Sequence, residues 1–556
     1  MKRALLITSL LVGAAGLVFV QTTSTPVPNP AALMPSGALL YLESPDFARL
    51  LRDWDESKVK SDWLDSDNYA AFSRSVLFTK LGEVYGQYGE AAGFAPGLPG
   101  VREIAGSDSA LALYGIRDVE FLYISRVGEA DLMKSQLWAV RDKFEQRQAA
   151  GVTFYLRTDP ASKRTAAFAF AKGLLLLATR DDLVAQSLEL LAGGTNPSVA
   201  SDRWYRDASA AAPNPGELRL VMNLEALVRS DYFRSYWVQR NASAVRRYWA
   251  GVADVRRSSS EITESRVFLS RETAASPVPV GALISMVPPE AGTYRASAVN
   301  DLSEAAAILV QKLIGPRVQR SRDPRYAPMA ISADNRAGSE GDLETRIDEQ
   351  PLPADAGVSD SEAAIRDMLQ KGRARSSLLV QASSPPVGSF VPLGSVIVLT
   401  GDADWDRDSV RSALASAAGK LWTTSQLGAA WVGGTAGNNA VERLDGLGAL
   451  MFAARGRLLF IGNDARLLGA VLDRAANAPG ASTFTYAAGV RHRLEQANFE
   501  RVMRALDFGS PANGPTFFSG NIGSLSRVLL PIDEVKFTEE DRGVSTAQTV
   551  VYRLVQ

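Results

Sequence analysis

The sequence predicts an α+β fold of two tandem homologous units, each an antiparallel β-sheet with helices packed mainly on one face, after an N-terminal apolar helix. Three observations predict this architecture. The chain has 556 residues, which is more than a single hydrophobic core usually organises. A strand–helix segment that starts at Phe170 returns near Phe452. An uncharged apolar run from Ala4 to Val20 opens the chain.

The N-terminal segment has the pattern of an export signal. Lys2 and Arg3 precede the apolar run, which is long for a signal peptide and short for a spanning helix. We expect residues 1–20 to be an uncleaved signal anchor, with a cleaved signal peptide as the alternative. The basic residues keep this end cytoplasmic, which places residues 21–556 outside the cytoplasm. Residues 21–36 are rich in Pro, Thr and Ser and are predicted to form a linker.

The composition restricts the classes of function. The formal net charge of −1 and the sequence pI of about 6.2 give no overall positive field, so we expect no nucleic-acid partner. The lack of cysteine excludes thiol catalysis, thiolate metal sites and disulfide bonds. With 46% apolar and 22% charged residues, the chain has the composition of a folded protein rather than a polytopic membrane protein.

The repeated segment predicts the same strand–turn–strand–helix unit twice. In each copy an apolar strand ends at a basic residue and a glycine, Gly173 or Gly456, before a second strand. The second strand is followed by an aspartate, Asp181 or Asp464, and then by apolar residues at helical spacing. An aspartate at this place can cap the helix by accepting a hydrogen bond from a free backbone N–H group. We therefore expect two hairpins, each followed by a helix that packs on its sheet.

Other segments repeat in the same order, which supports duplication of a whole unit. GALLYLESPDFARLL at Gly37 resembles GALISMVPPEAG at Gly281, and each half closes on a β-rich segment. We predict a first unit at residues 37–275 and a second at 276–556. The second copy is longer, with a flexible insertion expected at about 316–375, where the sequence is charged and rich in Pro and Gly. A partner-binding segment is the alternative interpretation of this insertion.

The first copy alone contains a segment in which aromatic residues are interleaved with arginines, between Leu227 and Val252. Such surfaces are typical of protein interfaces and of contacts with a membrane surface. The alternative is a helix whose aromatic face covers the sheet while its arginines are solvated. An earlier charged segment with Trp54, Trp63 and Tyr69 is adequately explained by solvated charged helices with anchoring aromatic residues, and it is also a further candidate surface for partners. The predicted partner surface comprises Tyr232, Phe233, Tyr236, Trp237, Arg240, Arg246, Arg247 and Trp249.

Two matches to catalytic motifs fail on spacing or environment. Ser-x-x-Lys at residues 57–60 and Ser-Asp-Asn at 66–68 resemble penicillin-binding enzymes, but there the motifs lie far apart in sequence, and this chain has no Lys-Thr-Gly. The single histidine, His492, lies between Arg491 and Arg493, which disfavour the protonated state that a Ser-His-Asp mechanism needs. We expect His492 to be an ordinary surface residue on a helix.

The aspartates in GDADWDRDSV, residues 401–410, alternate as in a calcium-binding loop. Arg407 stands where such a loop needs glycine, and Ala413 stands where it needs glutamate. We therefore expect helix capping here, with adventitious calcium as the alternative. The sequence predicts no catalytic residue, no cofactor and no metal site, so the protein is predicted not to be an enzyme.

The strand GALLYLESPDF and the recurring pattern of FAKGLLLLATRDDL resemble bacterial membrane-anchored envelope proteins of a domain-of-unknown-function family. The resemblance covers most of residues 37–556. It implies a bacterial, membrane-associated, extracytoplasmic protein, and it transfers no catalytic residue. Together with the predicted signal anchor, it leads us to expect a single-pass inner-membrane protein with its bulk in the periplasm, or a secreted protein if the signal is cleaved.

These observations predict an extracytoplasmic, membrane-anchored binding or scaffold protein of the cell envelope, whose partner is an envelope protein or a lipid. Two alternatives remain. One is a carrier of lipid or another apolar ligand, which would need an apolar cavity between sheet and helices. The other is a hydrolase of envelope material that uses only carboxylates, for which two carboxylates about 5–10 Å apart in a cleft would be the structural sign. The sequence does not specify the oligomeric state.

Overall fold

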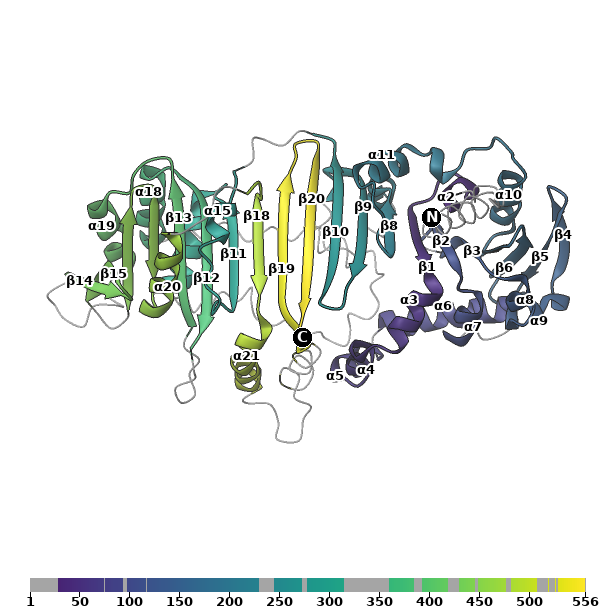
Figure 1. Cartoon of the computed structure of the whole chain (residues 1–556), viewed down its shortest axis with the longest axis horizontal. Coiled ribbons are helices and arrows are strands. Elements are labelled where there is room, and N and C mark those ends of the chain that lie inside the picture. The colour runs from purple at the N-terminus through teal and green to yellow at the C-terminus, as the bar shows by residue number, and fades with distance from the viewer. Residues whose placement is uncertain are drawn as a thin grey trace, which may run out of the picture. The chain divides into compact units, whose positions relative to one another are not determined.

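A computed structural model gives the fold of the chain (Figure 1). The fold class is α+β, as predicted, with large antiparallel sheets on which helices pack. The chain divides into two compact units: unit 1 comprises Met1–Phe47 and Gln87–Arg206, and unit 2 comprises Ala48–Gly86 and Asp207–Gln556. The structure describes residues 29–74, 76–93, 98–116, 118–229, 245–272, 278–314, 360–384, 393–418, 430–445, 449–476, 482–507, 519, 526 and 529–555.

Unit 1 is built on an antiparallel sheet. Its strands are β1 (Leu40–Asp46), β2 (Ser107–Gly115), β3 (Glu120–Arg126), β4 (Glu145–Ala149), β5 (Val152–Thr158), β6 (Thr165–Ala171) and β7 (Leu174–Ala178). They pair in the order β1-β2-β3-β7-β6-β5-β4. The turn from β6 to β7 consists of Lys172 and Gly173, whose φ angles are 52° and 76°. Two positive φ angles match the twist of a two-residue hairpin, so the hairpin predicted at Gly173 is confirmed.

Helices pack on this sheet. Buried Leu132 and Leu137 pack in one cluster with Phe168 of β6 and Leu175 of β7. In chain order to residue 211 the described helices are α2 (Pro30–Leu33), α3 (Phe47–Asp55), α4 (Lys58–Leu64), α5 (Asp67–Phe72), α6 (Val76–Ala92), α7 (Leu98–Ile104), α8 (Glu129–Leu132), α9 (Gln136–Ala139), η1 (Arg141–Lys143), α10 (Asp181–Leu191), η2 (Val199–Ser201) and α11 (Arg203–Ala211). Of these, the parts within residues 48–86 and 207–211 belong to unit 2. The short helices α8 and α9 therefore supply the apolar side chains that close this part of the core.

Unit 2 holds a longer antiparallel sheet. Its strands are β8 (Leu218–Met222), β9 (Tyr248–Arg257), β10 (Glu261–Ser270), β11 (Thr293–Ala298), β12 (Ala374–Ser383), β13 (Leu393–Gly401), β14 (Ala430–Ala436), β15 (Asn439–Asp445), β16 (Leu450–Arg455), β17 (Leu458–Gly462), β18 (Tyr486–Val490), β19 (Ile532–Asp541) and β20 (Ser545–Leu554). The order is β8-β9-β10-β20-β19-β18-β11-β12-β13-β17-β16-β15-β14. Its last seven strands, β11-β12-β13-β17-β16-β15-β14, follow the same order as the seven strands of unit 1.

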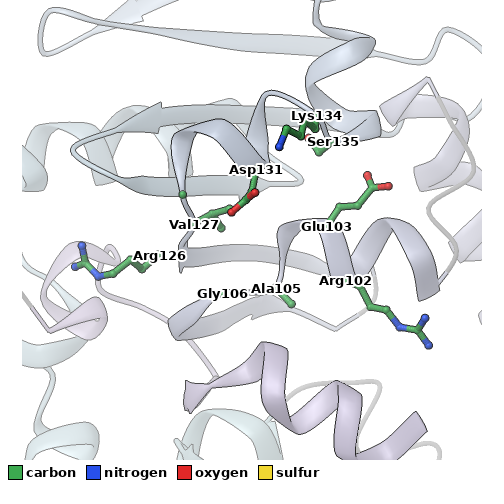
Figure 2. A pocket seen from close by; sticks show the side chains of 10 residues that line it. Arg102, Glu103, Ala105, Gly106, Arg126, Val127, Asp131, Lys134 and Ser135 are labelled. Carbon is green, nitrogen blue, oxygen red and sulfur yellow. The ribbon is translucent and has the colours of Figure 1, made fainter. Parts of the chain in front are cut away.

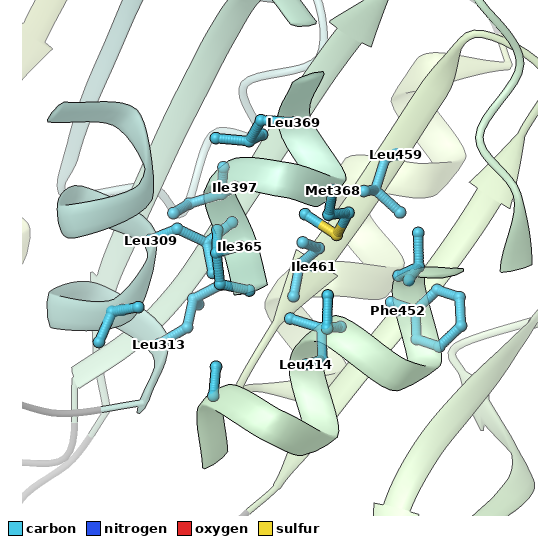
Figure 3. Packing of buried hydrophobic residues seen from close by; sticks show 14 of the residues in the cluster. Leu309, Leu313, Ile365, Met368, Leu369, Ile397, Leu414, Phe452, Leu459 and Ile461 are labelled. Carbon is cyan, nitrogen blue, oxygen red and sulfur yellow. The ribbon is translucent and has the colours of Figure 1, made fainter. Parts of the chain in front are cut away.

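Both faces of this sheet carry helices around strand β13. The described helices of this part are α12 (Leu224–Arg229), α15 (Gly281–Ile284), α16 (Leu302–Leu309), η3 (Val310–Ile314), α18 (Asp360–Lys371), α19 (Arg407–Ala418), α20 (Ala465–Ala475) and α21 (His492–Leu506). On β13, Ile397 and Leu399 pack against α16, α18 and α19, as Figure 3 shows in part. The alternate residues Val396 and Val398 pack with side chains of α15 and α20. Because alternate strand residues face opposite sides, the prediction of helices mainly on one face is wrong here.

The two aspartates predicted as helix caps occupy different positions. Asp464 precedes α20, and its Oδ1 accepts a hydrogen bond from the Leu467 backbone N at 2.8 Å. This cap is confirmed. Asp181 is instead the first residue inside α10, where Arg180 is the cap residue and no side chain caps the helix. The Asp181 carboxylate accepts a hydrogen bond from Arg147 at 2.8 Å, so it links the helix to strand β4.

Two segments that the sequence assigns to flexible chain are partly folded. Residues 29–36 belong to the predicted linker, yet α2 lies there and Ala31 and Met34 are fully buried. Residues 360–375 belong to the predicted insertion, yet α18 buries Ile365 and Leu369. Residues 1–28, which include the predicted anchor, and residues 315–359 lie outside the described part of the chain. Within the described part, no helix combines the length and the apolar character needed to cross a membrane.

Candidate functional site

The predicted partner surface is described only at its C-terminal end. Arg246 and Arg247 are exposed, as expected. Trp249 does not extend a helix, because it belongs to strand β9, where it is half-buried. The Arg247 guanidinium lies 4.6 Å from the ring centroid of Tyr248, a residue that is itself buried in the sheet. The other predicted residues of this surface, Tyr232, Phe233, Tyr236, Trp237 and Arg240, lie outside the described residues.

A second candidate surface, the earlier charged segment, lies on the consecutive helices α3, α4 and α5. The apolar residues Leu50, Leu51 and Trp54 of α3 recur at helical spacing. Such a stripe normally faces a core, yet no residue of α3 or α4 is buried. Trp54 and Leu64 each leave 43% of their surface exposed. We call the exposed residues of this segment the α3–α5 surface: Arg49, Arg52, Trp54, Glu56, Lys58, Val59, Ser61, Leu64, Asp65 and Phe72.

The α3–α5 surface rests on its own small aromatic cluster. The ring centroids of Trp63 and Tyr69 are 6.1 Å apart, and those of Phe72 and Phe78 are 5.4 Å apart, both in edge-to-face arrangements. These rings connect α4 and α5 with α6, and such contacts stabilise aromatic pairs by about 0.5–1.5 kcal/mol. The surface is therefore built on packed helices, and the aromatic residues Trp63 and Tyr69 that the sequence singled out form its support.

The serines of the apparent catalytic motifs have structural roles in these helices. The Ser57 hydroxyl accepts a hydrogen bond from the Lys60 backbone N at 3.2 Å and caps α4. The Ser66 hydroxyl accepts one from the Tyr69 backbone N at 3.1 Å at the start of α5. Serine is one of the preferred residues for satisfying free N–H groups at a helix start. Helix capping thus accounts for both serines without any acyl-transfer chemistry.

The charges around the α3–α5 surface are mostly paired within it, with an acidic excess. Lys58 contacts Asp62 at 2.6 Å, and Lys60 contacts Asp55 in a second ion pair. Residues 47–72 contain four basic and six acidic residues, a net charge of −2. The exposed charged side chains carry both signs, because Arg49, Arg52 and Lys58 lie beside Glu56 and Asp65. The surface therefore combines exposed apolar side chains with charges of both signs.

Unit 1 contains a polar cavity of about 460 Å³ where α7, the end of β3 and the α8–α9 segment meet (Figure 2). In Figure 2 the carboxylates of Glu103 and Asp131 and the amine of Lys134 lie along this space, whereas the guanidinium groups of Arg102 and Arg126 point away from it. The cavity is lined by Arg102, Glu103, Ala105, Gly106, Arg126, Val127, Gly128, Asp131, Lys134 and Ser135. Sequence reasoning did not find it, because its residues come from four separate elements and match no motif.

Several polar groups of the cavity already support the local fold. Glu103 Oε2 accepts a hydrogen bond from the Gln136 backbone N at 2.7 Å, which satisfies the start of α9. Ser135 Oγ donates to the Leu132 carbonyl at 2.6 Å. Arg126 Nε lies 3.3 Å from Asp108 Oδ2. The cavity offers two carboxylates for proton transfer, but Glu103 is at the same time a structural acceptor.

A buried hydroxyl network lies behind the cavity. The hydroxyl oxygens of Ser109 and Ser125 are 2.7 Å apart, and the Tyr123 hydroxyl oxygen lies 3.3 Å from the Ser109 hydroxyl oxygen and 3.2 Å from the Ile104 carbonyl oxygen. Burial raises the pKa of the Tyr123 hydroxyl above its ordinary value. Tyr123 therefore stays protonated, and the network ties the end of α7 to strands β2 and β3.

His492 differs from the prediction of an ordinary surface residue. It is the first residue of α21 and is half-buried, and its Nε2 lies 2.7 Å from the Ser526 hydroxyl. Burial lowers the pKa of the imidazole. Ser526 is fully buried, so this hydroxyl has no open route to a substrate. The contact therefore joins α21 to residue 526 and does not form an accessible nucleophile.

The predicted helix cap in the aspartate-rich segment is confirmed. Asp406 Oδ2 accepts a hydrogen bond from the Ser409 backbone N at 2.8 Å, next to the start of α19, and this bond holds the pKa of Asp406 below its ordinary value. Asp402 lies 3.6 Å from the Arg375 guanidinium. Across the described parts of the chain, no group of three or more His, Asp or Glu side chains is arranged to hold a metal ion.

Comparison with known proteins leaves the family unassigned. No family model matches the chain, and no curated protein matches its sequence. Among solved structures, crystal form I of TP0453 is 11% identical with a TM-score of 0.25, covering 45% of this chain and 82% of that one. Crystal form III is 12% identical with a TM-score of 0.25, covering 47% and 87%, and crystal form IV is 11% identical with a TM-score of 0.26, covering 47% and 85%. Likeness at this level carries no argument about function.

Proposed function

We propose that the protein is an extracytoplasmic, membrane-anchored binding or scaffold protein of the bacterial cell envelope, and that its partner binds the α3–α5 surface. The observation that carries the proposal is the exposure of Trp54 on α3, Leu64 on α4 and Phe72 on α5. Helices α3 and α4 contain no buried residue at all. Apolar side chains grouped along a surface segment mark contact sites, because water contact with them is unfavourable. The anchor itself rests on residues 1–20, through their apolar run and the preceding basic residues.

The chemistry of the α3–α5 surface favours a protein as the partner. Tryptophan and phenylalanine supply large contact areas and are enriched in protein interfaces. The surface lacks the dense cluster of basic residues that binds anionic head groups, because its exposed charges are of both signs and Arg49 and Lys58 are paired with Asp53 and Asp62. A partner with apolar side chains and a rim of mixed charge complements these features.

The proposal includes the duplicated architecture and the envelope family that the sequence resembles. Strands β11 to β17 follow the same neighbour order as β1 to β7, and an identical order of seven strands supports descent of 37–275 and 276–556 from one ancestral unit. Each copy contains a hairpin where the sequence repeat predicts one, between β6 and β7 and between β16 and β17. Their turns differ, because Lys172 and Gly173 both have a positive φ, whereas in the second turn only Gly456 does. A duplicated scaffold can keep one copy's sheet intact while an added element, here the helices between β1 and β2, acquires a binding surface.

A second candidate function rests on the cavity of unit 1. Glu103 and Asp131 line the same space, and a carboxylate-only hydrolase requires two carboxylates in one cleft. Lys134 beside them could bind an anionic group of a substrate. The structural role of Glu103 at the start of α9 makes this function the weaker candidate.

Crosslinking in living cells tests both candidates. The full-length tagged chain would be crosslinked in the membrane fraction and its partners identified by mass spectrometry, with Trp54→Ser/Leu64→Ser as the surface variant. Val544→Ser is the matched control, because Val544 is 65% exposed in another region. We expect partners that the double variant loses and the control retains. Equal recovery from both variants would contradict the α3–α5 surface.

The hydrolase candidate gives a different result. If the protein is a hydrolase, Glu103→Gln and Asp131→Asn should each reduce the release of soluble fragments from envelope material. Trp54→Ser/Leu64→Ser should leave this release unchanged. Arg229→Ala serves as the control, since this side chain is 71% exposed in a surface ion pair. Activity that falls in both carboxylate variants, with unchanged protein partners, would replace the scaffold function by the hydrolase.

A further inference from the structure

Strands β4 and β14 are edge strands: among the described residues, each pairs with a neighbouring strand on one side only. Strand β4 pairs with β5, and β14 pairs with β15 over all seven residues from Ala430 to Ala436. The outer edge of such a strand presents backbone N–H and C=O groups that a further strand can bind. Strand β4 is the last strand in the order of unit 1, and β14 is the last strand in the order of unit 2. Their edges can therefore be compared directly.

The edge of β4 carries the charges that normally prevent pairing with another chain. Its sequence is EQRQA, and Glu145 and Arg147 are exposed. Arg147 Nε lies 3.0 Å from Glu145 and its Nη1 lies 2.8 Å from Asp181. A second copy of β4 placed antiparallel about its centre would bring Arg147 opposite Arg147 of the partner subunit, and directly opposed like charges destabilise a strand pair.

The edge of β14 lacks such protection. Its sequence is AWVGGTA, without a charged residue, and Val432 is 37% exposed. Trp431 is held inward by an edge-to-face contact with Phe452 at 5.1 Å. The strand is therefore fixed to the core on one side, while its neutral backbone edge and Val432 face outward. Natural edge strands of this length are usually protected by charge, proline or a bulge.

We propose that β14 pairs antiparallel with β14 of a second copy of this chain, about a two-fold axis at Gly433. This register overlaps all seven residues. It places Ala430 opposite Ala436 of the partner subunit, Trp431 opposite Thr435 of the partner subunit, and Val432 opposite Gly434 of the partner subunit. Every opposed pair is neutral, so the edge is complementary to itself, as a two-fold interface requires.

The contact joins two sheets but is small. A specific stable interface usually buries more than about 1,200 Å² in total, and one pair of seven-residue strands buries less than this. We therefore expect association that depends on protein concentration. Anchoring both copies to one membrane would raise their effective concentration. The inference does not depend on the proposed function, since β14 and the α3–α5 surface share no residue.

Cysteine crosslinking tests the register, because the chain contains no cysteine of its own. In Gly433→Cys of the full chain, each new cysteine lies opposite its own copy. Opposed residues in an antiparallel pair have Cα atoms about 4.5–5.5 Å apart, which fits a disulfide. A Cβ atom at Gly433 meets no atom within 4 Å, so the substitution fits the fold. We expect a disulfide-linked dimer under mild oxidation.

Two controls distinguish pairing from random collision. In Thr435→Cys the two cysteines lie about 13 Å apart in this register, so we expect little crosslinking. Arg147→Cys places a cysteine on the protected edge of β4, where we also expect little. Crosslinking of Gly433→Cys that is no faster than that of Thr435→Cys would overturn the proposal.

A charged variant gives a second measurement that does not need a disulfide. Val432→Lys should shift the full chain in detergent towards the monomer in sedimentation equilibrium while its melting temperature stays unchanged. An unchanged monomer–dimer equilibrium would overturn the proposal. The proposal would also be overturned if the parent chain is a monomer and its β14 edge binds an extended peptide of another protein. In that case Gly433→Cys would crosslink to other proteins, and Val432→Lys would remove these crosslinks.

Discussion

Arg219 and Asp254 face each other across strands β8 and β9 and form a buried ion pair with two hydrogen bonds, of 2.8 and 2.9 Å. Only 5% of Arg219 and 2% of Asp254 is exposed. Asp254 Oδ1 also accepts a hydrogen bond from the Gly216 backbone N at 2.9 Å. The carboxylate is therefore satisfied on several sides, as a buried charge must be.

Loss of one partner of this pair should destabilise unit 2 strongly. In Arg219→Ala the Asp254 carboxylate remains buried without its guanidinium, which we expect to lower the free energy of unfolding by about 3–5 kcal/mol. The measurement is urea unfolding of the full chain. In the control Arg229→Ala, loss of an exposed pair with Glu225 should change stability by about 0.3–0.5 kcal/mol. Similar values for both variants would refute the buried pair as a large contributor.

Acidification below neutral pH should destabilise the protein through His492. Burial lowers the pKa of this imidazole, so the unfolded chain binds the proton first as the pH falls through its usual value of about 6.5. The free energy of unfolding should thus be highest above this pH and fall as the pH decreases through this range. Glu500 opposes the shift, and Phe499 packs on the ring at 5.9 Å.

Urea unfolding at pH 7.5 and pH 5.5 checks this expectation. The chain has a single histidine, and carboxylates with lowered pKa values, such as Asp406 and Glu540, lose their contributions at lower pH. His492→Gln should therefore remove most of the difference between the two pH values. An equal pH dependence in the variant would show that other groups cause it.

A methyl group at Gly106 should disrupt the cavity of unit 1. A Cβ atom there would lie 1.9 Å from the Arg126 carbonyl oxygen and 2.9 Å from Ser125 Oγ, so β2 and β3 would have to separate. We expect Gly106→Ala to cost about 1–3 kcal/mol or more. Gly82 in α6 meets no atom within 4 Å, and Gly82→Ala should stabilise its helix by about 0.5–1 kcal/mol. Thermal unfolding measures both variants. A shift of the melting temperature in the same direction for Gly106→Ala and Gly82→Ala would contradict these expectations.

Local patterns predicted the elements whose causes are local. The hairpin at Gly173 follows from a turn of two residues with positive φ, and the cap at Asp464 follows from one side chain and one backbone N–H group. The coverage of both sheet faces was also encoded, because Val396 to Leu399 form an apolar run without alternation, as in strands buried on two sides. The sequence interpretation instead assigned the helices to one face.

The candidate sites were harder to predict because tertiary contacts create them. The cavity is lined by Glu103 of α7 and by Asp131 of α8, and nothing in the spacing of these residues shows that they share one space. The burial of His492 depends on Ser526, which is 34 residues away. Trp249 reads as part of an aromatic helix, but pairing in the sheet places it in β9. The segment that carries the α3–α5 surface was singled out by its aromatic and charged composition, but of its named aromatic residues only Trp54 is exposed, while Trp63 and Tyr69 pack against each other.

Removal of Trp54 should separate partner binding from folding. Because Trp54 is 43% exposed and α3 buries no residue, we expect Trp54→Ser to change the free energy of unfolding by less than about 0.5 kcal/mol. Trp204 is only 7% exposed, and Trp204→Ala should cost about 3–5 kcal/mol. Urea unfolding measures both values, and crosslinking measures partner recovery. A large loss of stability in Trp54→Ser would mean that this tryptophan serves the fold, whereas lost partners at unchanged stability would assign it to binding.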